Sequence, residues 1–181
     1  MKKALLVIDV QNEYFNGKLK VTYPQNSLDN ILRVMDYAKE NNIIIILVQH
    51  TGIDGETFIK NSKGWDIHAD VLKKDYNYII EKTKPSSFYN TDLEDILKRE
   101  NIEGVIISGY MTQMCCDTTA RDAFHKGYAV EFLSDATGTI DVSNKIGTIS
   151  SKDLHNATLI AQSLRFSNVL STKELIEKNN L

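Results

Sequence analysis

Short apolar runs alternate with segments of helical hydrophobic spacing along the whole chain. The runs Lys3–Val10 (KALLVIDV) and Ile43–Gln49 are almost continuously apolar, which is typical of strands buried on both faces. Between them, Ser27–Asn41 repeats its apolar residues at the spacing of one helix face. Further strands are predicted at Tyr76–Glu81, Val105–Ile107, Ala129–Leu133 and Val169–Leu170, and further helices at Asp92–Arg99, Asp117–Phe124, Lys152–Phe166 and Thr172–Lys178.

This alternation predicts a three-layer α/β/α sandwich around a mainly parallel sheet of about six strands. No repeat, low-complexity tract or linker interrupts the chain, so residues 1–181 are interpreted as a single domain. Ligands of such sheets bind beyond the carboxyl ends of the strands. The polar, glycine-containing segment 51–64 is expected to form a loop over that edge. Four reactive side chains are expected to meet there: Asp9, His50, Lys82 and Cys115.

Composition narrows the class of protein further. With 42% hydrophobic and 25% charged residues, the chain is typical of a globular protein. The net charge of −3 without a basic block gives no indication of a nucleic-acid or membrane partner. No apolar run approaches the ~20 residues of a membrane span, and the start lacks a signal-peptide pattern. The two cysteines are adjacent and offer no disulfide framework, so a cytoplasmic location is expected.

Cys115 follows a buried strand and stands at the start of a predicted helix. Free backbone N–H groups and the positive end of the helix dipole converge at such a position. They are expected to lower the pKa of the thiol below the ~8.5 of free cysteine. The same N–H groups are also expected to hold an oxyanion. The alternative is that Cys115 is a small buried hydrophobic residue.

Asp9 closes the first apolar strand, and Lys82 lies at the end of the third. Asp9 is interpreted as a partly desolvated carboxylate that takes a proton from Cys115, although an aspartate here can also cap a turn. Lys82 would orient this carboxylate and favour the thiolate, but a lysine at a strand end is often simply solvated. Lys84 is a competing candidate two residues away.

Five motifs in this order resemble the isochorismatase-like cysteine hydrolases over nearly the whole chain. They are ALLVIDVQNEYF around Asp9, Lys82-x-x-x-Ser86-x-Phe88 followed by Thr91-Asp92-Leu93, Gly109-x-x-Thr112-x-x-Cys115, Thr119-Ala120-Arg121, and Ser134-Asp135-Ala136-Thr137. The resemblance implies a catalytic triad of Asp9, Lys82 and Cys115, and its motif spacing selects Lys82 over Lys84.

The same resemblance implies a cis peptide bond between Tyr110 and Met111, and an oxyanion hole formed by the backbone N–H groups of Met111 and Cys115. The implied activity is hydrolysis of the C–N bond of a small amide through a thioester intermediate, without a cofactor. The assembly it implies is a homodimer or homotetramer. The residues expected to contact the substrate are Gln11, Phe15, His50, Trp65 and Tyr110, with Tyr14 a further candidate for the pocket wall.

Two departures from the family pattern bear on the substrate. Family members that hydrolyse isochorismate lack the nucleophilic cysteine, so Cys115 speaks against that activity. Nicotinamidases resemble this chain but carry a metal-binding Asp-x-His and a further histidine after the second strand, where this chain has only His50. Asp66-Ile67-His68 offers an Asp-x-His later in the chain, so a metal-assisted amidase is the alternative function. The preferred interpretation includes no metal ion.

Two further alternatives concern the class of protein. A non-catalytic small-molecule-binding protein could share the fold. A dinucleotide-binding protein is disfavoured, because no G-x-G-x-x-G follows the first strand. Cys116 points ~100° away from Cys115 on a helix and is interpreted as a residue that packs in the core. A redox pair formed by the two thiols is the less favoured alternative.

Overall fold

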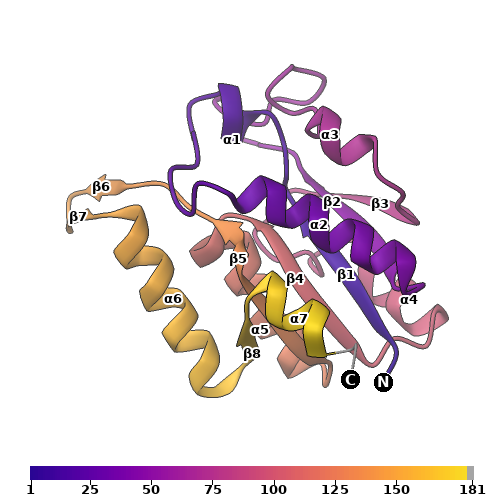
Figure 1. Cartoon of the computed structure of the whole chain (residues 1–181). Coiled ribbons are helices and arrows are strands. Elements are labelled where there is room, and N and C mark those ends of the chain that lie inside the picture. The colour runs from indigo at the N-terminus through magenta and orange to yellow at the C-terminus, as the bar shows by residue number, and fades with distance from the viewer. Residues whose placement is uncertain (179–181) are drawn as a thin grey trace.

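A six-stranded, wholly parallel sheet forms the centre of the computed structural model, which describes residues 1–178 (Figure 1). The strand order is β3-β2-β1-β4-β5-β8. The strands are β1 (Lys3–Ile8), β2 (Ile44–His50), β3 (Tyr78–Lys82), β4 (Gly104–Tyr110), β5 (Ala129–Gly138) and β8 (Asn168–Leu170). The last three residues of the predicted domain 1–181 lie outside the described residues.

Helices cover both faces of this sheet (Figure 1). One face carries α1 (Glu13–Asn16), α2 (Ser27–Glu40), α3 (Ala69–Leu72) and α7 (Thr172–Lys178). The other carries α4 (Leu93–Arg99), the π-helical turn η1 (Thr112–Cys116), α5 (Asp117–His125) and α6 (Ser151–Arg165). The predicted three-layer α/β/α sandwich is therefore confirmed.

The central strand β1 shows why its sequence is almost continuously apolar. Leu5 and Val7 belong to the core on the α2 side, whereas Ala4, Leu6 and Ile8 belong to the core on the α5 side. Because successive side chains of a strand point to opposite faces, a strand with two covered faces has no position left for a polar residue.

Strand β4 is longer than predicted. The prediction ended it at Ile107, before the polar Ser108 and the flexible Gly109. In the structure Ser108 is fully buried and its hydroxyl donates to the Leu6 carbonyl at 2.9 Å, so its polarity is satisfied within the sheet. Gly109 has φ +112°, and a Cβ there would lie 2.0 Å from the Ile8 carbonyl oxygen, so only glycine fits this close approach.

Several short features were missed by the hydrophobic pattern. Strand β5 continues past Leu133 to Gly138, after a register shift against β4. It is followed by a hairpin of β6 (Val142–Asn144) and β7 (Gly147–Ile149), which projects from the body of the molecule (Figure 1). The one-turn helices α1 and α3 also escaped prediction.

Over the described residues, no helix has the length and apolarity that crossing a lipid bilayer requires.

Candidate active site

The carboxyl edge of the sheet brings together an aspartate, a lysine and a cysteine that are far apart in the sequence. Lys82 is the last residue of β3, and its Nζ lies 2.8 Å from Asp9 Oδ2 and 3.3 Å from Cys115 Sγ. The side chains of Asp9 and Lys82 are fully buried, and Cys115 is only 7% exposed. The lysine therefore bridges a carboxylate and a sulfur that are largely shielded from water.

Asp9 follows β1 directly and adopts a left-handed backbone conformation with φ +52°. Its N–H donates to the Val48 carbonyl and its carbonyl accepts from the Gln11 N–H, so the turn is held on both sides. Oδ2 is bound by Lys82, whereas the buried Oδ1 has no hydrogen-bond partner among the described residues. This carboxylate consequently keeps one oxygen available as a proton acceptor.

Burial and the neighbouring charges set the ionisation of the lysine. Burial lowers the pKa of Lys82, but the negative charge of Asp9 and the hydrogen-bonding contact with the Cys115 sulfur outweigh burial, and the pKa lies above its ordinary value. Lys82 is therefore an ammonium group at neutral pH. A permanent positive charge beside Cys115 favours any negative charge that develops on the sulfur.

The thiol of Cys115 differs from the expectation drawn from the sequence. It lies in η1, two residues before α5 begins, and burial raises its pKa well above the ordinary value. The charge of Asp9 raises it further, while Lys82 opposes the rise. Burial beside a carboxylate raises the pKa of Cys115 by more than the nearby helix start lowers it. Cys115 is thus a neutral thiol at rest.

Backbone hydrogen bonds that reach back five residues form the turn η1 next to the sulfur. The N–H groups of Cys116 and Asp117 bond the carbonyls of Met111 and Thr112, five residues back. The N–H of Cys115 precedes them, among the amides for which a helix start offers no carbonyl. The peptide bond between Tyr110 and Met111 is cis.

Three consecutive side chains fix the segment just before η1. The hydroxyl of Tyr110 bonds Ser27 in α2 at 3.0 Å, and Thr139 Oγ1 lies 3.8 Å from Met111 Sδ. Thr112 Oγ1 lies 2.8 Å from Nδ1 of His155 in α6. Residues 110–112 are therefore held by side chains from three separate parts of the chain.

The substrate contacts expected from sequence surround this centre in different ways. Gln11 donates to the carbonyls of His50 and Trp65 and accepts from the His50 N–H, so its amide ties chain segments together. His50 has Nδ1 3.3 Å from Lys82 Nζ, and burial lowers its pKa despite the opposing charge of Asp9, so this ring is neutral. Phe15 packs on Tyr110 with the ring centroids 5.8 Å apart.

The segment 51–64 carries a residue that sequence reasoning missed. Phe58 lies in this polar loop, yet it is only 4% exposed and packs on Tyr14 and His50 at 5.2 and 5.3 Å. The loop is held to β3, because Glu81 accepts from both Thr51 and Lys60. Trp65 Nε1 also donates to Thr51 at 2.7 Å. A lone aromatic residue within a polar loop was the available signal that the loop folds inward.

The histidines considered as metal ligands make other contacts. His68 Nδ1 accepts from the Asp70 N–H, and its ring packs on Phe15 at 4.4 Å. His50 lies instead beside Lys82 and Phe58. Within residues 1–178, no group of three or more histidine, cysteine, aspartate or glutamate side chains is placed to hold a metal ion.

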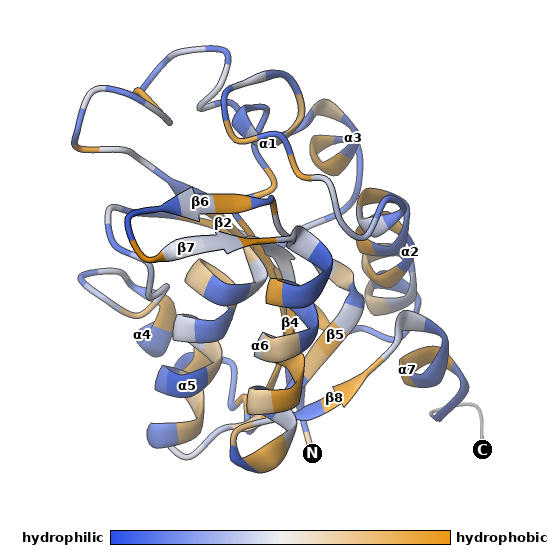
Figure 2. Ribbon diagram, turned by 90° about the vertical axis from the view of Figure 1, so that its left-hand side faces the viewer, coloured by the Kyte–Doolittle hydropathy of each residue, from blue (hydrophilic) through white to orange (hydrophobic). Residues whose placement is uncertain are grey.

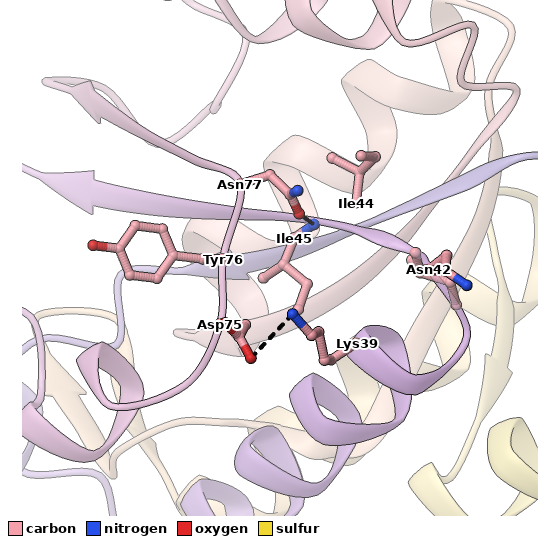
Figure 3. Close-up of a pocket in the computed structure, with 8 residues that line it drawn as sticks. Lys39, Asn42, Ile44, Ile45, Asp75, Tyr76 and Asn77 are labelled. Atoms are coloured by element: carbon pink, nitrogen blue, oxygen red, sulfur yellow. Dashed lines mark hydrogen bonds and ion pairs between the residues drawn. The ribbon is translucent and has the colours of Figure 1, made fainter.

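A separate cavity of about 290 Å³ lies at the amino-terminal edge of the sheet, near the starts of β2 and β3. Figure 3 shows Lys39 and Asp75 facing each other there, with Nζ 3.3 Å from Oδ2. Asn77 accepts from the Ile45 N–H in the same place. These polar groups are paired with one another or with the backbone, and the cluster of Asp9, Lys82 and Cys115 lies at the opposite edge of the sheet.

Known proteins resemble the chain over almost its entire length. The family model described as Isochorismatase domain matches residues 3–174. The isochorismatase family protein YddQ of Bacillus subtilis is 32% identical, covering 98% of this chain and 100% of the relative. Nicotinamidase 3 of Arabidopsis thaliana is 28% identical, covering 95% and 86%. A crystal structure from Burkholderia xenovorans LB400, provisionally named an isochorismatase, superposes with a TM-score of 0.95 at 38% identity, covering 98% and 87%.

Proposed function

The chain belongs to the isochorismatase family of hydrolases, and on that premise we propose that it is a cysteine-dependent amidohydrolase. It would cleave the C–N bond of a small amide through a thioester on Cys115. The observation that carries this proposal is the buried contact of Lys82 with both the Asp9 carboxylate and the Cys115 sulfur.

The first step in this mechanism is attack by sulfur with transfer of its proton. Because the resting thiol is neutral, the proton leaves as the bond to the carbonyl carbon forms, and Asp9 accepts it. The unpartnered Oδ1 is the available acceptor, while Lys82 keeps Oδ2 in place. The ammonium group also stabilises the negative charge that develops on sulfur during the attack.

The carbonyl oxygen becomes an oxyanion in the same step. The backbone N–H groups of Met111 and Cys115 are proposed to receive it, since both belong to the segment that the side chains of Tyr110 and Thr112 fix. Donors held in advance need no reorganisation when the charge appears, and a single such donor is worth roughly 10²–10³ in rate.

Collapse of the tetrahedral intermediate releases the amine and leaves an acyl group on sulfur. Asp9 then returns its proton to the leaving nitrogen, so the amine departs neutral. A water molecule next attacks the thioester, with Asp9 again accepting a proton, and the carboxylic acid is released as the thiol reforms. The similarity to nicotinamidase 3 supports an amide as the substrate class.

The direct test is ammonia release from a panel of small amides, including nicotinamide and carbamoyl compounds. Cys115→Ala is expected to abolish hydrolysis while the far-ultraviolet circular dichroism stays unchanged. Asp9→Asn is expected to lose more than the ~10²–10⁴ of simple acid–base help, because activation of the nucleophile is lost as well. Mass spectrometry of the wild-type protein under turnover should detect the acyl adduct on Cys115.

Cys116 provides the matched control. It is fully buried in the core beside the nucleophile, so Cys116→Val changes a neighbouring sulfur without removing the reactive one. This variant should keep most of the activity. An active Cys115→Ala protein, or inactivation by Cys116→Val alone in a folded protein, would contradict the assigned nucleophile.

A further inference from the structure

A histidine is buried against the turn η1 and takes no part in the steps proposed above. His155 lies on the inward face of α6 and is only 2% exposed. The other buried side chains of this face are Ser151, Thr158 and Gln162. Figure 2 shows α6 beside α5, in front of the sheet. A helix in such a place normally turns an apolar face to the core, so the buried ring requires specific partners.

Both ring nitrogens of His155 are bonded, and their partners fix the tautomer. Nε2 lies 2.8 Å from the Ser134 carbonyl oxygen, and Nδ1 lies 2.8 Å from Thr112 Oγ1. A carbonyl oxygen can only accept, so Nε2 carries the proton. Burial lowers the pKa of His155, and although the bond to Ser134 opposes this shift, the ring is neutral at neutral pH. Nδ1 is therefore an acceptor, and the Thr112 hydroxyl donates to it.

The two bonds of His155 connect η1 with an irregular part of the sheet. Ser134 lies in β5 between Phe132 and Thr137, where the register against β4 shifts. Within the described strands it has no partner residue in the ladder with β4 or with β8, and its carbonyl accepts from His155. Thr112 is fully buried and is the first residue of η1. His155 therefore ties η1 to β5.

The plane of the His155 ring is held as well. Tyr23 packs against it edge to face, with the ring centroids 5.3 Å apart. The backbone of Tyr23 pairs with that of Thr139, whose Oγ1 lies 3.8 Å from Met111 Sδ. The residues that orient His155 are thus also those that contact Met111, next to the turn.

We propose that His155 is a positioning residue that acts through Thr112 on the two backbone donors of the oxyanion hole. The inference rests on the proposed acyl transfer at Cys115. Thr112 stands directly after Met111 and three residues before Cys115, whose N–H groups are proposed to receive the oxyanion. Because Nδ1 of His155 binds the Thr112 hydroxyl, the side chain of Thr112 is locked, and with it the backbone between the two donors.

The expected effect is on the transition state, because the oxyanion develops only as the tetrahedral intermediate forms. Losing the bond between His155 and Thr112 should lower the rate of acyl transfer by about 10²-fold, as a misplacement of roughly 1 Å does. The ground-state amide carries no such charge, so kcat should fall while KM changes little. A role in folding alone would leave kcat of the folded protein unchanged.

Two reagents separate the positioning of the donors from the activation of the sulfur. p-Nitrophenyl acetate transfers its acetyl group to Cys115 through an oxyanion and releases nitrophenolate, which stopped-flow absorbance follows. Iodoacetamide alkylates the same sulfur by displacing iodide, so no carbonyl oxyanion forms. In His155→Phe and in Thr112→Val, acylation should slow by about 10²-fold while alkylation stays close to wild type. Thr112→Val exchanges the hydroxyl for a methyl group of similar size, so it decides the question where His155→Phe lowers the folded fraction.

Conservative variants and a matched control sharpen the test. His155→Gln retains one donor and one acceptor, and Thr112→Ser retains the hydroxyl, so both should keep most of the acylation rate. Combining His155→Phe with Thr112→Val should be no slower than the slower single variant, because both remove the same hydrogen bond. The control is Thr158→Val, on the same buried face of α6, where the hydroxyl donates to the Leu154 carbonyl of its own helix. It should leave both rates unchanged.

The outcomes are read on proteins that circular dichroism shows to be folded. Acylation close to wild type in His155→Phe or in Thr112→Val overturns the inference, and so does a Thr112→Ser protein as slow as Thr112→Val. Parallel loss of acylation and alkylation overturns it too, since the sulfur and not the donors would then be affected. Additive losses in the double variant would show that the two residues act separately and also overturn it. A wild-type protein that is not acylated at Cys115 and hydrolyses no amide refutes the proposed function, and the inference falls with it.

Discussion

Replacing Lys82 by methionine tests the buried ion pair most directly. The ammonium of Lys82 lies 2.8 Å from Asp9 Oδ2, and both side chains have no exposed area. Methionine keeps most of the volume of the lysine stem but removes the charge and its hydrogen bonds. Asp9 would then be an ionised carboxylate without a partner on either oxygen, since Oδ1 already has none among the described residues.

The cost of this change follows from desolvation. Removing one member of a buried ion pair typically destabilises a protein by about 3–5 kcal/mol, because the remaining charge stays buried and uncompensated. We expect Lys82→Met to lose this amount near neutral pH.

The assay is urea unfolding followed by the fluorescence of Trp65 at fixed protein concentration, near neutral pH. Lys84→Met is the matched control, since Lys84 is two residues away and exposed, and it should change the free energy of unfolding by less than about 0.5 kcal/mol. Adding Asp9→Asn to Lys82→Met should recover part of the loss. Equal stability of Lys82→Met and Lys84→Met at neutral pH would refute the reasoning.

Three further predictions concern stability. Gly109→Ala should cost at least about 4 kcal/mol in urea unfolding, because a Cβ there meets the Ile8 carbonyl at φ +112°; a near-neutral effect would contradict the close approach. Gln11→Met should cost about 3 kcal/mol by the same assay, since it leaves backbone groups of His50 and Trp65 unpaired, whereas exposed Asn16→Ala should not. Burial lowers the pKa of His50 and His155 below the ordinary histidine pKa of about 6.5. At a pH just below 6.5 the unfolded chain therefore binds more protons than the folded chain. Stability should therefore fall as the pH drops through that value, and His155→Gln should reduce the slope.

The positions of the reactive residues could be predicted because they depend on strand ends. Asp9, Lys82 and Cys115 each follow an apolar run, and parallel strands end at one edge of the sheet. The structure brings these three side chains into one buried cluster. The ionisation of Cys115 could not be predicted in the same way, because burial and the charge of Asp9 come from segments distant in sequence.

Hydrophobic patterning alone determined the layered α/β/α fold and most of its elements. A run such as Lys3–Ile8 consists almost entirely of apolar residues, which indicates a buried strand. Such a segment can be assigned as a strand without knowledge of its neighbours. The tertiary structure decided the fate of polar and aromatic residues that break the local pattern. Ser108 is inside because the Leu6 carbonyl accepts its hydroxyl, and Phe58 is inside because Tyr14 and His50 form its contact surface.

Helix α6 shows the same division most clearly. Its helical character follows from the sequence, but apolar spacing alone would turn Ile160 and Leu164 inward. Thr112, Ser134 and Asp117 instead satisfy its polar side chains and fix the opposite face against the sheet. A buried polar group is stable only where a partner meets it, and such partners exist only once distant segments have come together.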